Sequence, residues 1–586
     1  MRPRRTSILV AAVLVASTLV FTWPLAARLG THLAGPPGDN SIFAWNVWWF
    51  GEALWHEHRS PFYTPLLLHP RGADLAYHTT TLLGTVPGSV LARFLPLPVA
   101  FNLVVLGCFV FAGAAAYGLA RHVLRRAGVE GPRAAGLGLF AALAYTFAPF
   151  HWAHLGHLNI LNVGVVPLAA WAALRFAPRP TLRNSAALGA ALGLCALADG
   201  YFVLIAGLLV IALLVFEGRT WQLRSVARPL AASTIVFLIV SSPVLVPMLR
   251  YGSAGLEDVQ AGGANEYVAD PFSYVLPSPF HPLWGKAVLP VYARLSGNTA
   301  ENVVFPTFTV WVLALVAWRR RHRLAAPWGA EVRLWAVIAL AFVILSFGPF
   351  LHLLGRDRID IGDGTFLRLP LPKVLLDAVP LLSGARAAGR FAAAGQLALV
   401  LAAMLGLATL VRGRKTPRAT VGAVAFAVAA CLFECFPSSA PTTRVEHSAA
   451  YEQLAAAIRA GAPRGALLEV PPVHANDKAT QFQQTVHGLP LLGGRLARIR
   501  RDAYDHLHRD PFLHRTLDNE PWQPYDALLS LAGLDSLGVE YVMLHRAHAT
   551  HEAIGRVLAR NFETMHESED AILMRRRRAA NAPRSP

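Results

Sequence analysis

Residues 388–411 read AGRFAAAGQLALVLAAMLGLATLV, an apolar run that is long enough to cross a lipid bilayer as a single helix. Arg386 and Arg390 stand at its start, and four basic residues follow its end: Arg412, Arg414, Lys415 and Arg418. Basic residues that flank an apolar run of this length are typical of a transmembrane helix. This stretch therefore predicts that the chain is a membrane protein.

The same kind of run recurs along the chain, near residues 7–27, 100–120, 134–150, 160–176, 185–200, 201–217, 229–249, 303–318, 332–351 and 419–437. Composition agrees, because 54% of the residues are hydrophobic and only 15% are charged, whereas a soluble domain carries about 25% charged residues. We therefore expect a polytopic α-helical membrane protein, with about eleven transmembrane helices in residues 1–437.

The positions of the arginines predict the orientation of these spans. Every second connection is rich in arginine, and the positive-inside rule places such connections in the cytoplasm. The basic connections hold Arg2–Arg5, Arg121–Arg133, Arg175–Arg183, Arg219–Arg228, Arg319–Arg323 and Arg412–Arg418. The N-terminus is then cytoplasmic in a bacterial inner membrane, and the net charge of +18 reflects topology rather than a nucleic-acid partner.

The remaining connections are expected on the periplasmic or extracellular face. They are residues 28–98, 151–159, 250–302 and 352–387, together with the chain after residue 437. Residues 79–97 of the first outer loop are apolar but contain Pro87, Gly88 and Arg93, so we expect interfacial helices there rather than another span. The first span fits either a retained helix or a cleaved signal sequence.

Residues 438–578 have a different character and predict a small α/β domain on the outer face. Helical periodicity over 451–460 and 551–561 alternates with strand-like runs at 466–470, 540–544 and 571–574. Residues 579–586 are expected to form a disordered tail. The four cysteines all lie in apolar runs, which predicts buried thiols and no disulfide in this domain: Cys108, Cys195, Cys431 and Cys435.

Several polar residues of the outer loops could carry chemistry. Asp39 closes the turn GPPGDN at residues 35–40, and three aromatic residues that favour the membrane interface follow it: Trp45, Trp48 and Trp49. His154 and His157 share a helical face in a short loop, where they bind either a phosphate or only interfacial hydrogen-bond partners. Further candidates are His78, Asp199, Tyr201, Glu301 and the outer-face arginines Arg386 and Arg390, which suit a phosphate.

The order of these features resembles the GT-C superfamily of integral-membrane glycosyltransferases. An acid opens a long outer loop after the first span, about ten spans follow, and a soluble domain ends the chain. Short local stretches add to the resemblance: Gly38-Asp39-Asn40 with Trp45 and Trp48, Pro70-Arg71-Gly72, His157-Leu-Asn159, Arg386-Ala-Ala-Gly-Arg390-Phe391 and Leu468-Glu469-Val470-Pro471. The resemblance covers nearly the full chain and points to a bacterial branch of this superfamily.

The resemblance implies a hexosyl or pentosyl transfer from a polyprenyl-phosphate sugar to a glycan, lipid or protein acceptor at the outer leaflet. Asp39 would be the general base of an inverting reaction. Arg386, Arg390, His154 and His157 would stabilise the leaving phosphate. Contacts to the substrate would come from Asn40, His78, Asn159, Asp199, Tyr201 and Glu301. The predicted cytoplasmic connections contain no glycine-rich phosphate loop, which agrees with a lipid-linked donor rather than a nucleotide sugar.

One departure from the superfamily affects the expected cofactor. Many relatives carry paired acids in the first loop, but Asn40 follows Asp39 here, so we expect no cofactor and do not favour a divalent metal. Glu52 and Asp74 could supply a second carboxylate. Two other functions stay open at this stage, namely a transporter or flippase for a lipid-linked saccharide and a non-catalytic scaffold for envelope assembly. The sequence shows no internal repeat of the kind that transporters carry.

Overall fold

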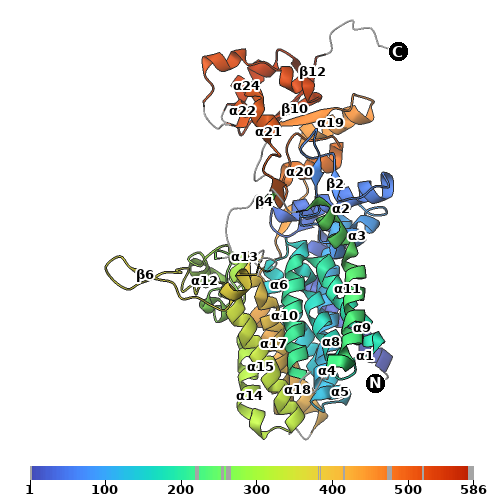
Figure 1. The fold of residues 1–586 in the computed structure, drawn as a ribbon, viewed down its shortest axis with the longest axis vertical. Helices are drawn as coiled ribbons and strands as arrows, with labels where there is room; N and C mark the ends of the chain where they lie inside the picture. The colour runs from blue at the N-terminus through green and yellow to red at the C-terminus, as the bar shows by residue number, and fades with distance from the viewer. Residues whose placement is uncertain are drawn as a thin grey trace.

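The computed structural model describes residues 3–217, 223–252, 256–258, 265–379, 382, 385–412, 416–471, 478–517, 521–548 and 550–577. A long helical bundle forms one end of the molecule and the C-terminal domain forms the other, with the first outer loop between them (Figure 1). The predicted tail, residues 579–586, lies outside the described residues, as do Arg2, Arg219, Arg414 and Lys415 of the predicted basic connections.

Eight helical segments of the described chain are long and apolar enough to cross a membrane. They are Leu97–Arg126, Gly131–Ala153, Leu158–Phe176, Gly200–Glu217, Val226–Tyr251, Ala326–Ser346, Ala388–Arg412 and Pro417–Cys435. Figure 1 labels their main helices α4 (Leu97–Arg126), α5 (Gly131–Thr146), α6 (Pro149–Ala153), α7 (Leu158–Leu161), α8 (Val165–Phe176), α10 (Gly200–Glu217), α11 (Leu223–Tyr251), α15 (Ala326–Ser346), α17 (Ala392–Arg412) and α18 (Pro417–Cys435). Each segment coincides with a predicted span, so the chain is a multi-pass membrane protein as predicted.

The other three predicted spans are also helices, although they are not among these eight segments: α1 (Pro3–Phe21), α9 (Leu182–Ala198) and α14 (Phe308–Arg320). The span predicted to begin at residue 303 begins five residues later. Pro306 disfavours helical backbone in the residue before it, and the Thr307 hydroxyl caps the helix by accepting a hydrogen bond from the backbone N–H of Val310 (3.2 Å).

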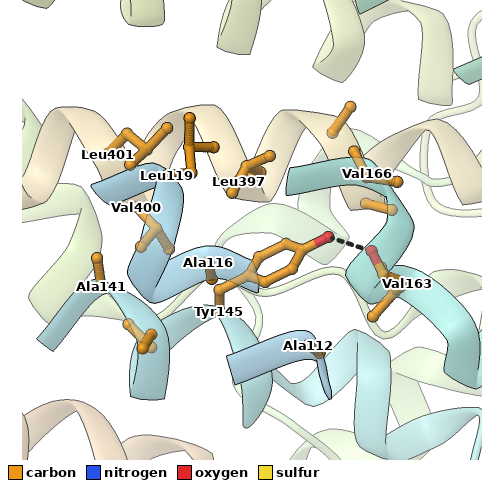
Figure 2. Packing of buried hydrophobic residues seen from close by; sticks show 14 of the residues in the cluster. Ala112, Ala116, Leu119, Ala141, Tyr145, Val163, Val166, Leu397, Val400 and Leu401 are labelled. Atoms are coloured by element: carbon orange, nitrogen blue, oxygen red, sulfur yellow. Dashed lines mark hydrogen bonds between the residues drawn. The ribbon is translucent and has the colours of Figure 1, made fainter. Parts of the chain in front are cut away.

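Almost every residue of helix α17 is buried, which shows that this helix lies at the centre of the bundle. Its Leu397, Val400 and Leu401 face small residues of α4 and α5, and the Tyr145 hydroxyl donates a hydrogen bond to the carbonyl of Val163 (Figure 2). At Gly406 the helix approaches α14 so closely that any side chain would overlap the backbone of Leu313. Small residues thus allow the close helix contacts that pack a membrane bundle.

A partly buried ion cluster joins three helices at one end of the bundle. Arg126 at the end of α4 contacts Glu217 at the end of α10 and Glu331 in the first half of α15, at 2.5 Å in each case. The indole N–H of Trp335 donates a further hydrogen bond to Glu331 (3.1 Å). The connections next to these helix ends were all predicted to be basic and cytoplasmic, and the structure places them together.

The first outer loop and the C-terminal domain form a continuous layer. Strand β1 (His32–Ala34) pairs antiparallel with β7 (Thr442–Arg444), although about four hundred residues separate them. Helix α2 (Asp39–Gly51) contacts α20 (Lys478–His487), and the indole N–H of Trp45 donates to the Gln484 side-chain oxygen (2.8 Å). Trp45 and Trp49 are fully buried here rather than at lipid headgroups as we expected, because the C-terminal domain covers them.

The apolar stretch at 79–97 contains the helix α3 (Leu82–Leu91). Its ten residues rise only about 15 Å, too short a distance to cross a bilayer. It packs on α2 and α4 at the end of the bundle nearest the C-terminal domain (Figure 1). The stretch thus contains a short helix instead of a spanning one, and its place at the membrane interface stays a prediction.

The C-terminal domain contains a four-stranded sheet in the order β11-β12-β10-β8. Strands β8 (Ala466–Val470) and β10 (Val539–His545) are parallel, and β12 (Ala571–Arg576) runs antiparallel to β10. Helices α19 (Ala449–Arg459) and α24 (His551–Leu558) contact this sheet, which confirms the predicted α/β fold. We did not predict the edge strand β11 (Phe562–Glu567), because its mostly exposed residues show no alternation of apolar and polar side chains.

The remaining elements are short. Helices α12 (Gly285–Tyr292), α13 (Thr299–Asn302) and α16 (Lys373–Asp377) lie in outer loops, and α21 (Asp505–Arg509), α22 (Pro511–Leu517) and α23 (Ala532–Ser536) belong to the C-terminal domain. Two-stranded pairings join β2 (Tyr63–Thr64) to β3 (Ala73–Asp74), β4 (Leu256–Asp258) to β9 (Arg498–Arg500), and β5 (Ile359–Asp360) to β6 (Phe366–Leu367).

Candidate functional site

Asp39 is the first residue of α2, and two glycines place it there. Gly38 precedes the helix with φ +136°, a backbone conformation that L side chains rarely adopt. Gly35 has φ +94° and lies so close to Gly156 that any side chain at residue 35 would overlap the Gly156 backbone. This contact brings the turn at 35–40 against the loop that holds His154 and His157.

The Asp39 carboxylate has two cationic or hydrogen-bonding neighbours. His157 Nε2 lies 2.9 Å from Asp39 Oδ2, and the Lys478 ammonium forms an ion pair with Asp39 Oδ1. Burial raises the pKa of Asp39, but the hydrogen bond and charge of His157 and the charge of Lys478 outweigh it and hold that pKa below its usual range. The side chain of Asp39 remains 39% exposed, so a reactant can reach it.

A second, more deeply buried cluster adjoins His157. Glu301 is 2% exposed, its Oε1 accepts a hydrogen bond from Arg390 Nε (3.0 Å), and Arg390 Nη2 forms an ion pair with the same oxygen at 2.9 Å. The Arg390 guanidinium also lies over the ring of Tyr201, 4.5 Å from its centroid. Burial raises the pKa of Glu301, but the charge of Arg390 outweighs it, so that pKa lies below its usual range and Glu301 is ionised.

His154 lies between the two clusters. Its Nδ1–H donates to the carbonyl of Phe150 (2.8 Å), and its Nε2 lies 3.8 Å from Glu301 Oε1, beyond hydrogen-bond length. Burial lowers the pKa of His154, so the ring is neutral and Nε2 carries a lone pair. Within the described chain, neither this nitrogen nor Glu301 Oε2 has a hydrogen-bond partner. His154 Nε2 and Glu301 Oε2 are therefore two buried acceptors for which the described residues supply no donor.

Asp199 and Tyr201 connect the short outer turn between α9 and α10 to this cluster. Asp199 Oδ2 accepts a hydrogen bond from the Asn159 side-chain amide (2.7 Å), and Asp199 Oδ1 accepts one from the backbone N–H of Tyr201 (2.8 Å). The Tyr201 hydroxyl accepts a hydrogen bond from the backbone N–H of Ala387 (2.9 Å), next to Arg386. Arg386 itself is half-buried just before Arg390.

Two predicted substrate residues make mainly internal contacts. The Asn40 amide group donates to the carbonyls of Ala34 and Gly35 and to the Thr443 hydroxyl, which joins the first loop to β7. His78 is buried, donates from Nε2 to Asn46 (3.2 Å) and accepts from the backbone N–H of Ala497 (3.1 Å). Burial lowers the pKa of His78 to about 4, so this ring is neutral.

The structure thus brings most of the predicted residues to one end of the bundle. Lys478 is a residue of the candidate site that the sequence did not reveal. It stands in the C-terminal domain, 439 positions from Asp39, and no local motif surrounds it. The only signal was compositional, because the chain has four lysines among 53 basic residues.

A metal centre built from His, Cys, Asp and Glu would require at least three of these side chains in one cluster. Within the described ranges, no such cluster is present. The four cysteines are free and buried, as predicted.

Comparison with known proteins gives one family and several loosely similar folds. No curated protein matches the chain. Among solved structures, the apo form of the Archaeoglobus fulgidus oligosaccharyltransferase is 13% identical, with a TM-score of 0.47, over 92% of this chain and 69% of that chain. The archaeal oligosaccharyltransferase AglB from the same organism, in complex with an inhibitory peptide and a dolichol-phosphate, is 13% identical with a TM-score of 0.35, over 92% and 69% of the two chains. At these TM-scores the similarity is too loose to support an argument about activity.

The family assignment rests on a match over most of the chain. Residues 6–433, which contain nearly all of the helical bundle and the first outer loop, match a family described as a domain of unknown function, DUF6311. The chain therefore belongs to the DUF6311 family.

Proposed function

We propose that this protein is a GT-C-type glycosyltransferase that moves a sugar from a polyprenyl-phosphate donor to an acceptor at the outer face of the bacterial inner membrane. The observation that carries the proposal is the position of Asp39. Its carboxylate is ionised, 39% exposed and next to basic side chains, at the end of the bundle opposite the Arg126 ion cluster. A base beside cations suits a reaction that removes a proton and releases a phosphate.

In the proposed reaction Asp39 removes the proton of the acceptor hydroxyl as its oxygen attacks the anomeric carbon. The bond between that carbon and the phosphate oxygen breaks, and its electron pair stays with the phosphate. Attack from the face opposite the leaving group inverts the anomeric configuration. The hydrogen bond from His157 holds the carboxylate in one orientation, which favours proton transfer.

The leaving phosphate requires positive charge, and the candidates that the sequence supplied are Arg386, Arg390, His154 and His157. Glu301 occupies Nε and Nη2 of Arg390, so a phosphate would meet this side chain at Nη1. For His154 we propose a different partner. Its neutral Nε2 and the Glu301 Oε2 are buried acceptors, which suit a sugar hydroxyl or a water rather than a phosphate.

The remaining residues complete the proposed substrate site. Asn159, Asp199 and Tyr201 line the same end of the bundle, while Asn40 and His78 support the first loop beneath Asp39. We propose that the reaction needs no metal, because a lysine and a histidine occupy the two oxygens of the Asp39 carboxylate. A lipid-linked donor needs no nucleotide site, in agreement with the short basic connections at the opposite end.

Proteoliposomes that contain the wild-type protein and a panel of radiolabelled polyprenyl-phosphate sugars would test the proposal. Release of label from one donor, in the presence of a membrane extract that supplies acceptors, is the expected result. Movement of intact labelled donor across the bilayer without release would instead assign a transporter. Neither release nor movement with any donor would favour a scaffold without catalysis.

A further inference from the structure

Lys478 is the first residue of α20, and it forms the one contact described between the C-terminal domain and the Asp39 carboxylate. Its side chain is 22% exposed, so its ammonium lies at the edge of the site rather than in the core. The Gln484 amide donates to the carbonyls of Leu66 and Leu489, and Gln484 Oε1 accepts from Trp45. These bonds fix α20 against the first outer loop and so fix where the Lys478 side chain begins.

The ion pair with Lys478 makes Asp39 a weaker base while the two side chains stay paired. A carboxylate that is paired with an ammonium ion holds its proton weakly, because protonation would lose the ion pair. The pKa of Asp39 below its usual range expresses the same effect. A substrate that removes Lys478 from Asp39 would make the carboxylate a stronger base.

We propose that the Lys478 ammonium exchanges the Asp39 carboxylate for the phosphate of the lipid-linked donor, so that donor binding both neutralises the phosphate and releases Asp39 to act as base. This inference rests on the proposed function and adds a phosphate-binding residue and an activating step to it. It also gives the C-terminal domain a direct part in the site, since α20 contributes the cation.

The chemistry of the donor supports this exchange. A sugar on a polyprenyl phosphate is a phosphodiester with a single negative charge, and the released polyprenyl phosphate gains a second charge as the bond breaks. An ammonium beside the phosphate is therefore bound more strongly at the transition state than in the ground state, as a catalytic contact requires. The flexible four-carbon stem of lysine lets the ammonium move between two anions while α20 stays in place. The N-terminus of α20 adds a favourable dipole for an anion at this position.

Equilibrium binding of polyprenyl monophosphate to the full-length protein in lipid nanodiscs tests this inference, with the uncharged polyprenol as the matched lipid. Lys478→Met should weaken binding of the monophosphate about tenfold or more, the effect of losing one charge-assisted contact, and leave the polyprenol affinity unchanged. Lys478→Arg keeps the charge and should bind within about threefold of the wild type. Lys286→Met, which removes an exposed lysine from another outer loop, is the control and should bind as the wild type.

The exchange makes a further prediction for Asp39, because the carboxylate and the phosphate compete for the same ammonium. Asp39→Asn should bind the monophosphate several-fold more tightly than the wild type. In the Lys478→Met background the same substitution should give no gain, so the double variant should bind as Lys478→Met does. A gain that persists in full in the double variant would show simple repulsion between two anions and would overturn the exchange. Monophosphate affinity of Lys478→Met within about twofold of the wild type would overturn it as well. Equal wild-type affinity for monophosphate and polyprenol would instead count against the proposed donor itself.

Discussion

The ion pair between Glu301 and Arg390 supports the site, and its loss should destabilise the whole protein. Glu301 is 2% exposed and the Arg390 side chain 19% exposed, and a hydrogen bond of 3.0 Å from Nε and an ion-pair contact of 2.9 Å from Nη2 join them. In Glu301→Gln the amide oxygen can still accept from Arg390, but the mostly buried guanidinium loses its counter-charge. Breaking a buried pair in this way costs about 3 kcal/mol.

The free energy of unfolding, measured by denaturant titration in mixed micelles, would test this magnitude. Asp505→Asn provides the matched control, because it breaks an ion pair with Arg509 whose side chains are 48% and 80% exposed. That variant should unfold as the wild type does. Arg390→Met in the Glu301→Gln background should recover part of the loss, since it removes the unpaired charge. A loss in Glu301→Gln no larger than in the control would refute the view that this pair holds the site together.

Four further predictions concern the site. Gly35→Ala should reduce transfer at least about tenfold, because a side chain at φ +94° overlaps Gly156 and separates Asp39 from His157; Gly422→Ala, which has open space around it, should keep full activity. His157→Asn should move the acidic limb of the transfer rate to higher pH, since the hydrogen bond that holds the pKa of Asp39 down, against its burial, is lost; an unmoved limb would contradict this. The stability that Glu301 contributes should be fully present above its ordinary pKa of 4.5 and should decline only as pH falls below that value, because folding lowers the pKa of Glu301. The difference in free energy of unfolding between wild type and Glu301→Gln, measured from pH 3 to pH 7, tests this. Excess chelator should leave transfer unchanged, and a strong loss restored by a divalent cation would refute metal independence.

Apolar runs and arginine placement predicted much of this structure, because both follow directly from the properties of a bilayer. The run at 388–411 forms the buried central helix. The C-terminal ends of α4 and α10 and the first half of α15 meet at one end of the bundle, as the alternation of basic connections requires. The same alternation predicted that His154, Glu301 and Arg390 would share the opposite end. That shared placement makes their mutual contacts possible, and the packing of the loops brings the side chains together.

The contacts between the first loop and the C-terminal domain could not be predicted in the same way. The pairing of Asp39 with Lys478 and of β1 with β7 joins segments about four hundred residues apart, and no local periodicity records such a contact. The tryptophans after Asp39 illustrate the consequence. Their composition suited the membrane interface, but Trp45 and Trp49 are buried because another domain covers them.

The most direct test of the central claim is single-turnover release of radiolabelled sugar from a polyprenyl-phosphate donor that the wild-type protein accepts. Asp39→Asn preserves the size of the side chain and removes the base, so the account predicts that release falls by a factor of about a hundred or more while the protein stays folded. Asp39→Glu, which keeps a carboxylate, should retain part of the activity. Release from folded Asp39→Asn at the wild-type rate would contradict the claim that Asp39 is the general base of a glycosyltransferase.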